Sequence, residues 1–182
     1  MKKEKKGLLI ITTLALLISS CKLLENRLLI FKGSRSNEAN IPGTPTYEEK
    51  PIYADYDCIP SPGNFEIGWV TYVIDGDSIK AEINGKEYEI RYIGINTPEY
   101  YSHEKVAAEK ATAENMALVK GKKIYLFRDL SNTDKYQRLL RYVFTEDYFV
   151  NYELVKRGFA ESKFYPPDIS CQNLFYQAAQ ES

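Results

Sequence analysis

The dipeptide Asn84-Gly85 stands between two runs of alternating polar and apolar residues, and it constrains the fold more than any other feature. Asn-Gly is a preferred sequence of the two-residue type I′ turn, which joins two antiparallel strands. The pattern therefore predicts a β-hairpin with strands over 78–83 and 86–93. A two-residue loop also determines the register, because it pairs Ile83 with Lys86 and every later pair follows from that one.

At the open end of this hairpin the register brings charged residues together. Ser78, which directly follows Asp75-Gly76-Asp77, is expected opposite Arg91. The return strand runs into the segment Gly94-Ile95-Asn96-Thr97-Pro98-Glu99, so carboxylates, an amide, a hydroxyl and a guanidinium should converge there. Oxygen ligands suit a hard divalent cation, and arginine binds phosphate through paired hydrogen bonds. The set therefore indicates phosphodiester chemistry.

The rest of the domain supplies further strands and helices. β-rich runs predict strands at 69–74, 123–127 and 139–144, which makes five strands with the hairpin. Because tight turns rather than helices link the first three strands, an α+β OB-fold is favoured over a parallel α/β sheet. We therefore expect a five-stranded Greek-key β-barrel with about three helices.

The three helices follow from apolar spacing and from residues typical of helix ends. Helical spacing predicts a helix over 104–119, with a glycine just after it. A second helix is expected over 151–157, with Asn151 as its N-cap and a glycine after its last turn. A third helix is expected to begin after Asp168, which would act as its N-cap.

The first residues have the features of an export signal. Four lysines precede an apolar run over 7–18, which is too short to span a bilayer, and small residues follow it. The segment Ile18-Ser19-Ser20-Cys21 resembles the lipobox of bacterial lipoproteins, in which the cysteine becomes the lipidated first residue. We expect residues 1–21 to be a lipoprotein-type signal peptide ending at lipidated Cys21. A plain secretory signal or a retained anchor is the alternative.

The signal divides the chain into three parts and predicts its location. Residues 22–65, rich in Asn, Glu, Pro, Gly and Ser towards their start, are expected to be a flexible tether, and residues 66–182 the folded domain. The protein would then be extracytoplasmic, held at the membrane of the cell envelope by its lipid or released from it. An exported compartment permits a disulfide between Cys58 and Cys171, with two buried thiols as the alternative.

Charge and histidine content narrow the function classes. The chain carries a formal net charge of −1, and without its basic leader the remainder is near −4. Overall attraction to nucleic acid is therefore absent, although lysines and arginines outnumber acids over 120–141 and can form a local basic surface. A single histidine, His103, excludes mechanisms that need a histidine pair. No cluster of zinc ligands is present in the sequence.

The order and spacing of these motifs are distinctive. Asp75-Gly76-Asp77-Ser78, the run from Arg91 to Glu99, and Thr133-Asp134-Lys135-Tyr136-Gln137-Arg138 follow one another in this sequence. Together with Val150-Asn151-Tyr152-Glu153-Leu154-Val155 and Tyr165-Pro166-Pro167, they resemble the staphylococcal nuclease family over about residues 68–180. The resemblance implies an OB-fold enzyme that uses Ca²⁺ to hydrolyse DNA and RNA with low sequence specificity, leaving 3′-phosphate ends.

The resemblance also implies a role for each matching residue. Asp77 corresponds to a direct calcium ligand, Asn96 stands where a second carboxylate ligand is usual, and Thr97 would offer its backbone carbonyl. Asp75 would act through a water molecule. The catalytic residues implied are Glu99, which orients or deprotonates the attacking water, and the phosphate-binding arginines Arg91 and Arg138. The implied nucleotide-binding residues are Lys135, Tyr136 and Tyr165.

Three departures from the family pattern leave alternatives open. Asn96 replaces an aspartate and removes one anionic ligand, so weaker calcium binding is expected. Gln137 stands where a glycine usually precedes the arginine, which would alter the loop that aims Arg138. The chain ends at Ser182, where the third helix is still developing, so we expect either a truncated sequence or a less stable domain. The alternative function is an OB-fold nucleic-acid-binding lipoprotein with weakened catalysis.

Overall fold

Five strands close into a barrel in the computed structural model, which describes residues 51–101 and 103–182. The strands are β1 (Glu66–Val73), β2 (Ser78–Ile83), β3 (Lys86–Tyr92), β5 (Lys123–Phe127) and β6 (Leu139–Phe144). Their order is β1-β2-β3-β6-β5, and β5 pairs with β1 to close the barrel. Only the pairing of β3 with β6 is parallel among these strands. The expected α+β OB-fold is therefore confirmed.

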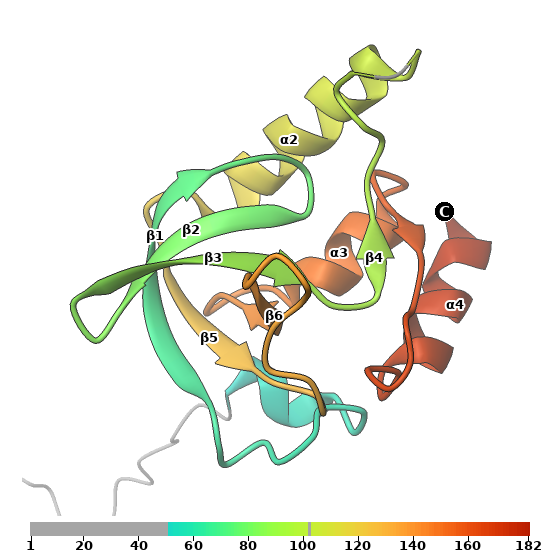
Figure 1. Ribbon diagram of the computed structural model, residues 1–182. Coiled ribbons are helices and arrows are strands. Elements are labelled where there is room, and N and C mark those ends of the chain that lie inside the picture. The colour runs from blue at the N-terminus through green and yellow to red at the C-terminus, as the bar shows by residue number, and fades with distance from the viewer. Residues whose placement is uncertain (1–50, 102) are drawn as a thin grey trace, which may run out of the picture. The chain divides into compact units, whose positions relative to one another are not determined.

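Helices cover the outside of the barrel (Figure 1). They are α2 (Lys105–Val119), α3 (Val150–Lys156) and α4 (Gln172–Glu181), preceded by the short 3₁₀ helix η1 (Ile52–Asp55). α3 contacts β6, α2 and α4. A second, two-stranded sheet of β4 (Ile95–Asn96) and β7 (Glu161–Ser162), which the sequence did not predict, lies beside them.

The hairpin has the register that its turn predicts. Asn84 and Gly85 have φ of 52° and 78°, as a type I′ turn requires, and Ser78 pairs with Arg91. Ile79 and Ile90 face each other and are fully buried in the core. Burial of this apolar face holds the polar end of the hairpin in place, because a one-residue slip would turn that face outward.

Two predicted helix caps are wrong. Asn151 lies inside α3, where its side chain accepts a hydrogen bond from Val143 N–H and donates to the carbonyl oxygens of Ile93 and Arg141. It is fully buried and satisfies backbone groups of the barrel instead of the helix end. α4 begins at Gln172, four residues after Asp168, whose carboxylate accepts from the N–H groups of Leu130 and Ser131. Tertiary partners outcompeted the local caps.

The segment 51–65 corrects the predicted tether. Ile59 is buried, and Tyr53, Tyr56 and Phe65 pack against the hydrophobic core, so this part belongs to the folded domain. Cys58 and Cys171 form a disulfide that joins this segment to the start of α4. Residues 22–50 of the tether and the lipobox, including Cys21, lie outside the described residues. Among those described, no helix combines the length and apolar character needed to cross a membrane.

Candidate active site

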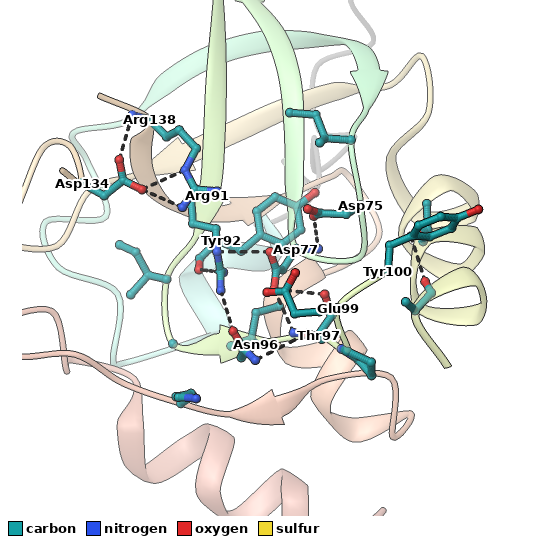
Figure 2. A pocket seen from close by; sticks show the side chains of 18 of the residues that line it. Asp75, Asp77, Arg91, Tyr92, Asn96, Thr97, Glu99, Tyr100, Asp134 and Arg138 are labelled. Atoms are coloured by element: carbon teal, nitrogen blue, oxygen red, sulfur yellow. Dashed lines mark hydrogen bonds and ion pairs between the residues drawn. The ribbon is translucent and has the colours of Figure 1, made fainter. Parts of the chain in front are cut away.

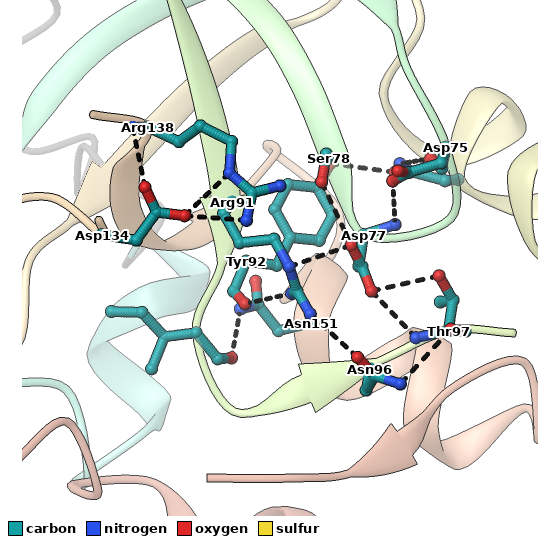
Figure 3. Close-up of polar contacts among 12 residues, drawn as sticks. Asp75, Asp77, Ser78, Arg91, Tyr92, Asn96, Thr97, Asp134, Arg138 and Asn151 are labelled. Atoms are coloured by element: carbon teal, nitrogen blue, oxygen red, sulfur yellow. Dashed lines mark hydrogen bonds and ion pairs between the residues drawn. The ribbon is translucent and has the colours of Figure 1, made fainter. Parts of the chain in front are cut away.

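Asp77 is the centre of the polar cluster at the open end of the hairpin. The residue is 6% exposed, and its Oδ2 accepts hydrogen bonds from the backbone N–H of Thr97 at 2.8 Å and from the Thr97 hydroxyl at 3.1 Å. Oδ1 accepts from the Ser78 hydroxyl at 3.1 Å. These bonds tie the loop before β2 to the strand β4, and they fix both carboxylate oxygens (Figure 3).

Arg91 comes from β3 and lies against the same carboxylate. Its Nε is 3.1 Å from Asp77 Oδ1, and both side chains are largely buried. Nη1 donates to the Tyr92 carbonyl oxygen at 2.7 Å, and Nη2 donates to Asn96 Oδ1 at 3.3 Å. The guanidinium is thus held on three sides. A cation fixed in this way is suited to stabilising negative charge that develops on a phosphate.

Asn96 and Thr97 stand where β4 ends. The Asn96 amide nitrogen donates to the Thr97 carbonyl oxygen at 3.4 Å and to Glu161 Oε1 at 3.3 Å. Figure 3 shows the Asn96 side chain between Arg91 and Thr97, close to Asp77. The amide oxygen of Asn96, the carbonyl oxygen of Thr97 and the carboxylate of Asp77 therefore lie near one another.

The turn before Asp77 is packed too tightly for a side chain at Gly76. A Cβ added there would lie 2.7 Å from Thr97 Cγ2 and 2.8 Å from Ala111 Cβ. Asp75 Oδ1 accepts from the Asp77 N–H, and the Asp75 carbonyl oxygen accepts from buried Asn115 on α2. Burial raises the pKa of Asp75, and the Asp77 charge raises it further, against hydrogen bonds that lower it. A cation bound nearby would favour its ionised form.

Arg138 follows a loop that contains its own acidic partner. Its Nε donates to Asp134 Oδ2 at 2.8 Å, and Nη2 lies 2.7 Å from the same oxygen. Partial burial would raise the pKa of Asp134, but bonds from the Arg138 side chain and from two backbone N–H groups outweigh burial and lower it. Asp134 therefore remains ionised and holds Arg138, a role that the sequence analysis missed.

Gln137 keeps the backbone that a glycine would favour. Its φ is 68°, in the left-handed region, and its N–H donates to the Asp134 carbonyl oxygen at 3.1 Å. A non-glycine residue in this conformation costs roughly 1 kcal/mol or more. The backbone at Gln137 therefore has a conformation that glycine adopts more readily, at a cost in strain.

The three predicted nucleotide-binding residues, Lys135, Tyr136 and Tyr165, lie at the surface. Tyr136 and Tyr165 are 67% and 61% exposed. Lys135 Nζ and Arg138 Cζ lie 4.9 Å and 5.5 Å from the centre of the Tyr136 ring. Exposed aromatic rings beside cations are suited to stacking on bases while the cations contact phosphate.

The predicted catalytic, metal-binding and nucleotide-binding residues all line one pocket of about 1210 Å³. Figure 2 shows Arg138 beside Asp134, and Asp77 between Arg91 and Thr97. The residues that the sequence singled out and that share this pocket are Asp75, Asp77, Arg91, Asn96, Thr97, Glu99, Lys135, Tyr136, Arg138 and Tyr165. The expected convergence of these side chains is therefore present, while their roles remain predictions.

The donors fit a hard cation that is bound by few carboxylates. Within the described part of the chain, no three His, Cys, Asp or Glu side chains form a group that could hold a metal ion. The candidate set instead combines the carboxylate of Asp77 with the amide oxygen of Asn96 and the carbonyl oxygen of Thr97. Oxygen donors of these three kinds are those that Ca²⁺ accepts. Neutral donors bind it more weakly than carboxylates do.

An OB-fold barrel that gathers aspartates, a glutamate and two arginines in one pocket defines the class of this protein as a phosphodiester-hydrolysing nuclease. The comparisons with known proteins agree. The protein family described as staphylococcal nuclease homologue matches residues 89–182. The chain belongs to the staphylococcal nuclease family.

Individual relatives extend the match towards the start of the barrel. A thermonuclease of Staphylococcus intermedius is 35% identical over 119 residues, which cover 62% of this chain and 69% of the relative. A thermonuclease of Staphylococcus hyicus is 32% identical over 116 residues, with the same shares covered. Endonuclease YncB of Bacillus subtilis is 35% identical over 114 residues, covering 60% of this chain and 54% of that protein.

Proposed function

We propose that this protein is a calcium-dependent nuclease that cleaves DNA, RNA or both with low sequence specificity and leaves 3′-phosphate ends. The observation that carries the proposal is that Asp77, Arg91, Asn96, Glu99 and Arg138 line one pocket. Low specificity is expected because the predicted contacts are to phosphates and base faces, which do not distinguish sequences.

The residues that would hold calcium are Asp77, Asn96 and the Thr97 carbonyl, with Asp75 acting through water. When bound, calcium would supply positive charge that stabilises the charge developing on the phosphate oxygens. Arg91, held by Asp77 and Asn96, and Arg138, held by Asp134, would bind the phosphate from two sides. Glu99 would orient the attacking water or accept its proton.

The test is to incubate the purified protein with labelled single-stranded DNA and RNA, with calcium or with a chelator. Cleavage in calcium that stops with the chelator is the expected result, and analysis of product ends should give 3′-phosphates. Binding without cleavage would favour the alternative, an OB-fold binding protein with weakened catalysis. That alternative is favoured by one observation, the amide of Asn96 in a carboxylate position. If the protein neither cleaves nor binds these nucleic acids, both functions are overturned.

We also propose that the protein is an exported lipoprotein, attached to the membrane of the cell envelope through Cys21. The support is the sequence before Cys21 and the disulfide between Cys58 and Cys171, because disulfides persist in oxidising compartments. Cells grown with a labelled fatty acid should label the protein, and Cys21→Ser should abolish the label. A label that survives this substitution would contradict the proposal.

A further inference from the structure

The short sheet β4–β7 places a carboxylate beside Asn96, the predicted ligand that stands where a carboxylate is usual. Asn96 on β4 pairs with Glu161 on β7, and directly opposed residues on antiparallel strands have neighbouring side chains. Glu161 Oε1 lies 3.3 Å from the Asn96 amide nitrogen. The substitution that removes an anionic ligand at 96 is thus accompanied by an anion at the cross-strand position.

The neighbours of Asn96 determine which end of its amide faces the pocket. Glu161 and the Thr97 carbonyl can only accept hydrogen bonds, so they take the N–H end. Arg91 can only donate, and it bonds the amide oxygen. An amide turned the other way would set its oxygen against a carboxylate and its N–H against a guanidinium. The oxygen of Asn96 is therefore kept on the side of Arg91 and Asp77.

We propose that Glu161 is a positioning residue of the calcium site. By accepting the N–H of Asn96, it holds the amide oxygen towards the cation and restores the negative charge that an aspartate at 96 would carry. Loss of a partner that orients and polarises a metal ligand typically weakens metal binding by about 10- to 100-fold. This inference rests on the calcium dependence proposed above.

Lys163 competes for the same carboxylate oxygen. Its Nζ lies 3.4 Å from Glu161 Oε1, but both side chains are about half exposed. Salt and water screen such a pair, so its contribution is small. Asn96 is less exposed, and its hydrogen bond to Glu161 is supported by the pairing of the two strands.

Calorimetric titration of the full chain with calcium tests the proposal without an activity assay. Glu161→Ala should weaken calcium binding by about 10-fold. Glu161→Gln keeps an acceptor oxygen but no charge, and its loss should be smaller. Asn96→Asp should tighten binding. In that variant Glu161→Ala should cost less than in the wild type, because a carboxylate has no N–H end to orient.

The matched control is Glu87→Ala, which removes the same charge near the hairpin turn. Glu87 lies four residues along β3 from Arg91, roughly 13 Å away, and this variant should leave the affinity unchanged. A second readout is the melting temperature in chelator. Asn96→Asp should lower this temperature, because it places a carboxylate beside that of Glu161. Adding Glu161→Ala to the Asn96→Asp variant should restore it.

The outcomes separate the inference from the function on which it rests. Wild-type affinity in Glu161→Ala would overturn the inference and leave the calcium-dependent function standing. Glu161→Ala could also reduce calcium affinity equally in the wild type and in the Asn96→Asp variant. That result would overturn the inference, because it would show only a distant effect of charge. No calcium binding by the wild type would overturn the proposed function, and the inference with it.

Discussion

Gly76→Ala is the sharpest test of how the turn before Asp77 positions the site. The added methyl group would lie 2.7–2.8 Å from three carbon atoms, Thr97 Cγ2, Thr97 Cβ and Ala111 Cβ. Carbon atoms in contact are ordinarily about 3.5–4.0 Å apart, so a displacement of about 1 Å is required. Neither neighbour can move aside by rotation, because Thr97 is held by Asp77 and Ala111 presents only its Cβ.

Either the turn with Asp77 must therefore shift, or Thr97 and α2 must both shift. Overpacking of a buried site costs about 2 kcal/mol in the free energy of unfolding, which lowers the melting temperature of a domain of this size by about 8 °C. Because the shift includes a proposed calcium ligand, kcat/KM for nucleic acid should fall by about 100-fold. Urea unfolding and a calcium-dependent cleavage assay on the folded protein measure the two effects.

Gly63→Ala is the matched control. A Cβ at Gly63 would meet nothing within 4 Å, and this glycine is exposed, so the substitution should change neither stability nor cleavage. Wild-type stability and activity in Gly76→Ala would refute the argument that close packing of the turn against Thr97 holds the site together. Equal losses in both variants would attribute the effect to glycine itself rather than to the contact.

Three further predictions follow from single contacts. Asp77→Asn should lower the free energy of unfolding in calcium-free buffer by about 2 kcal/mol, because it leaves the largely buried guanidinium of its partner without a counter-charge; an unchanged urea midpoint would contradict the ion pair. Arg138→Lys should reduce kcat by about 100-fold with calcium affinity unchanged, whereas Arg157→Lys, which breaks comparable bonds to acidic side chains outside the pocket, should leave kcat as it is. Replacing Cys58 and Cys171 by serine should cost about 4–5 kcal/mol in denaturant unfolding, since the bond closes a loop of 113 residues; equal stability with and without reductant would show that the bond does not constrain the unfolded chain.

Local sequence was sufficient for the barrel strands and for the cluster at their open end. The Asn84-Gly85 turn admits one register, and the alternation of apolar residues selects the buried face, so the meeting of Ser78 with Arg91 followed from neighbouring residues alone. The family resemblance extended this to Asn96, Glu99 and Arg138, and the same residues line the pocket.

Contacts between distant segments explain what the sequence could not. Asn151 and Asp168 have the residue type of helix caps, but both bond to backbone groups that only the folded chain brings within reach. From the sequence, Gly76 is a typical turn residue. In the fold, a Cβ added there would collide with Thr97 and Ala111. Residues near Asn151, Asp168 or Gly76 in the sequence do not indicate these partners, because the partners come from distant segments that meet only in the folded chain.

The residue types of the site and the hairpin that presents Arg91 are thus determined by short stretches of sequence, since turn geometry and side-chain chemistry are local. The acidic partner of Asn96 was decided only on folding. Glu161 meets Asn96 because two-residue strands 65 positions apart pair beside the barrel. Such a pairing depends on contacts across the whole chain, which no short stretch of sequence contains, and it sets the charge beside Asn96.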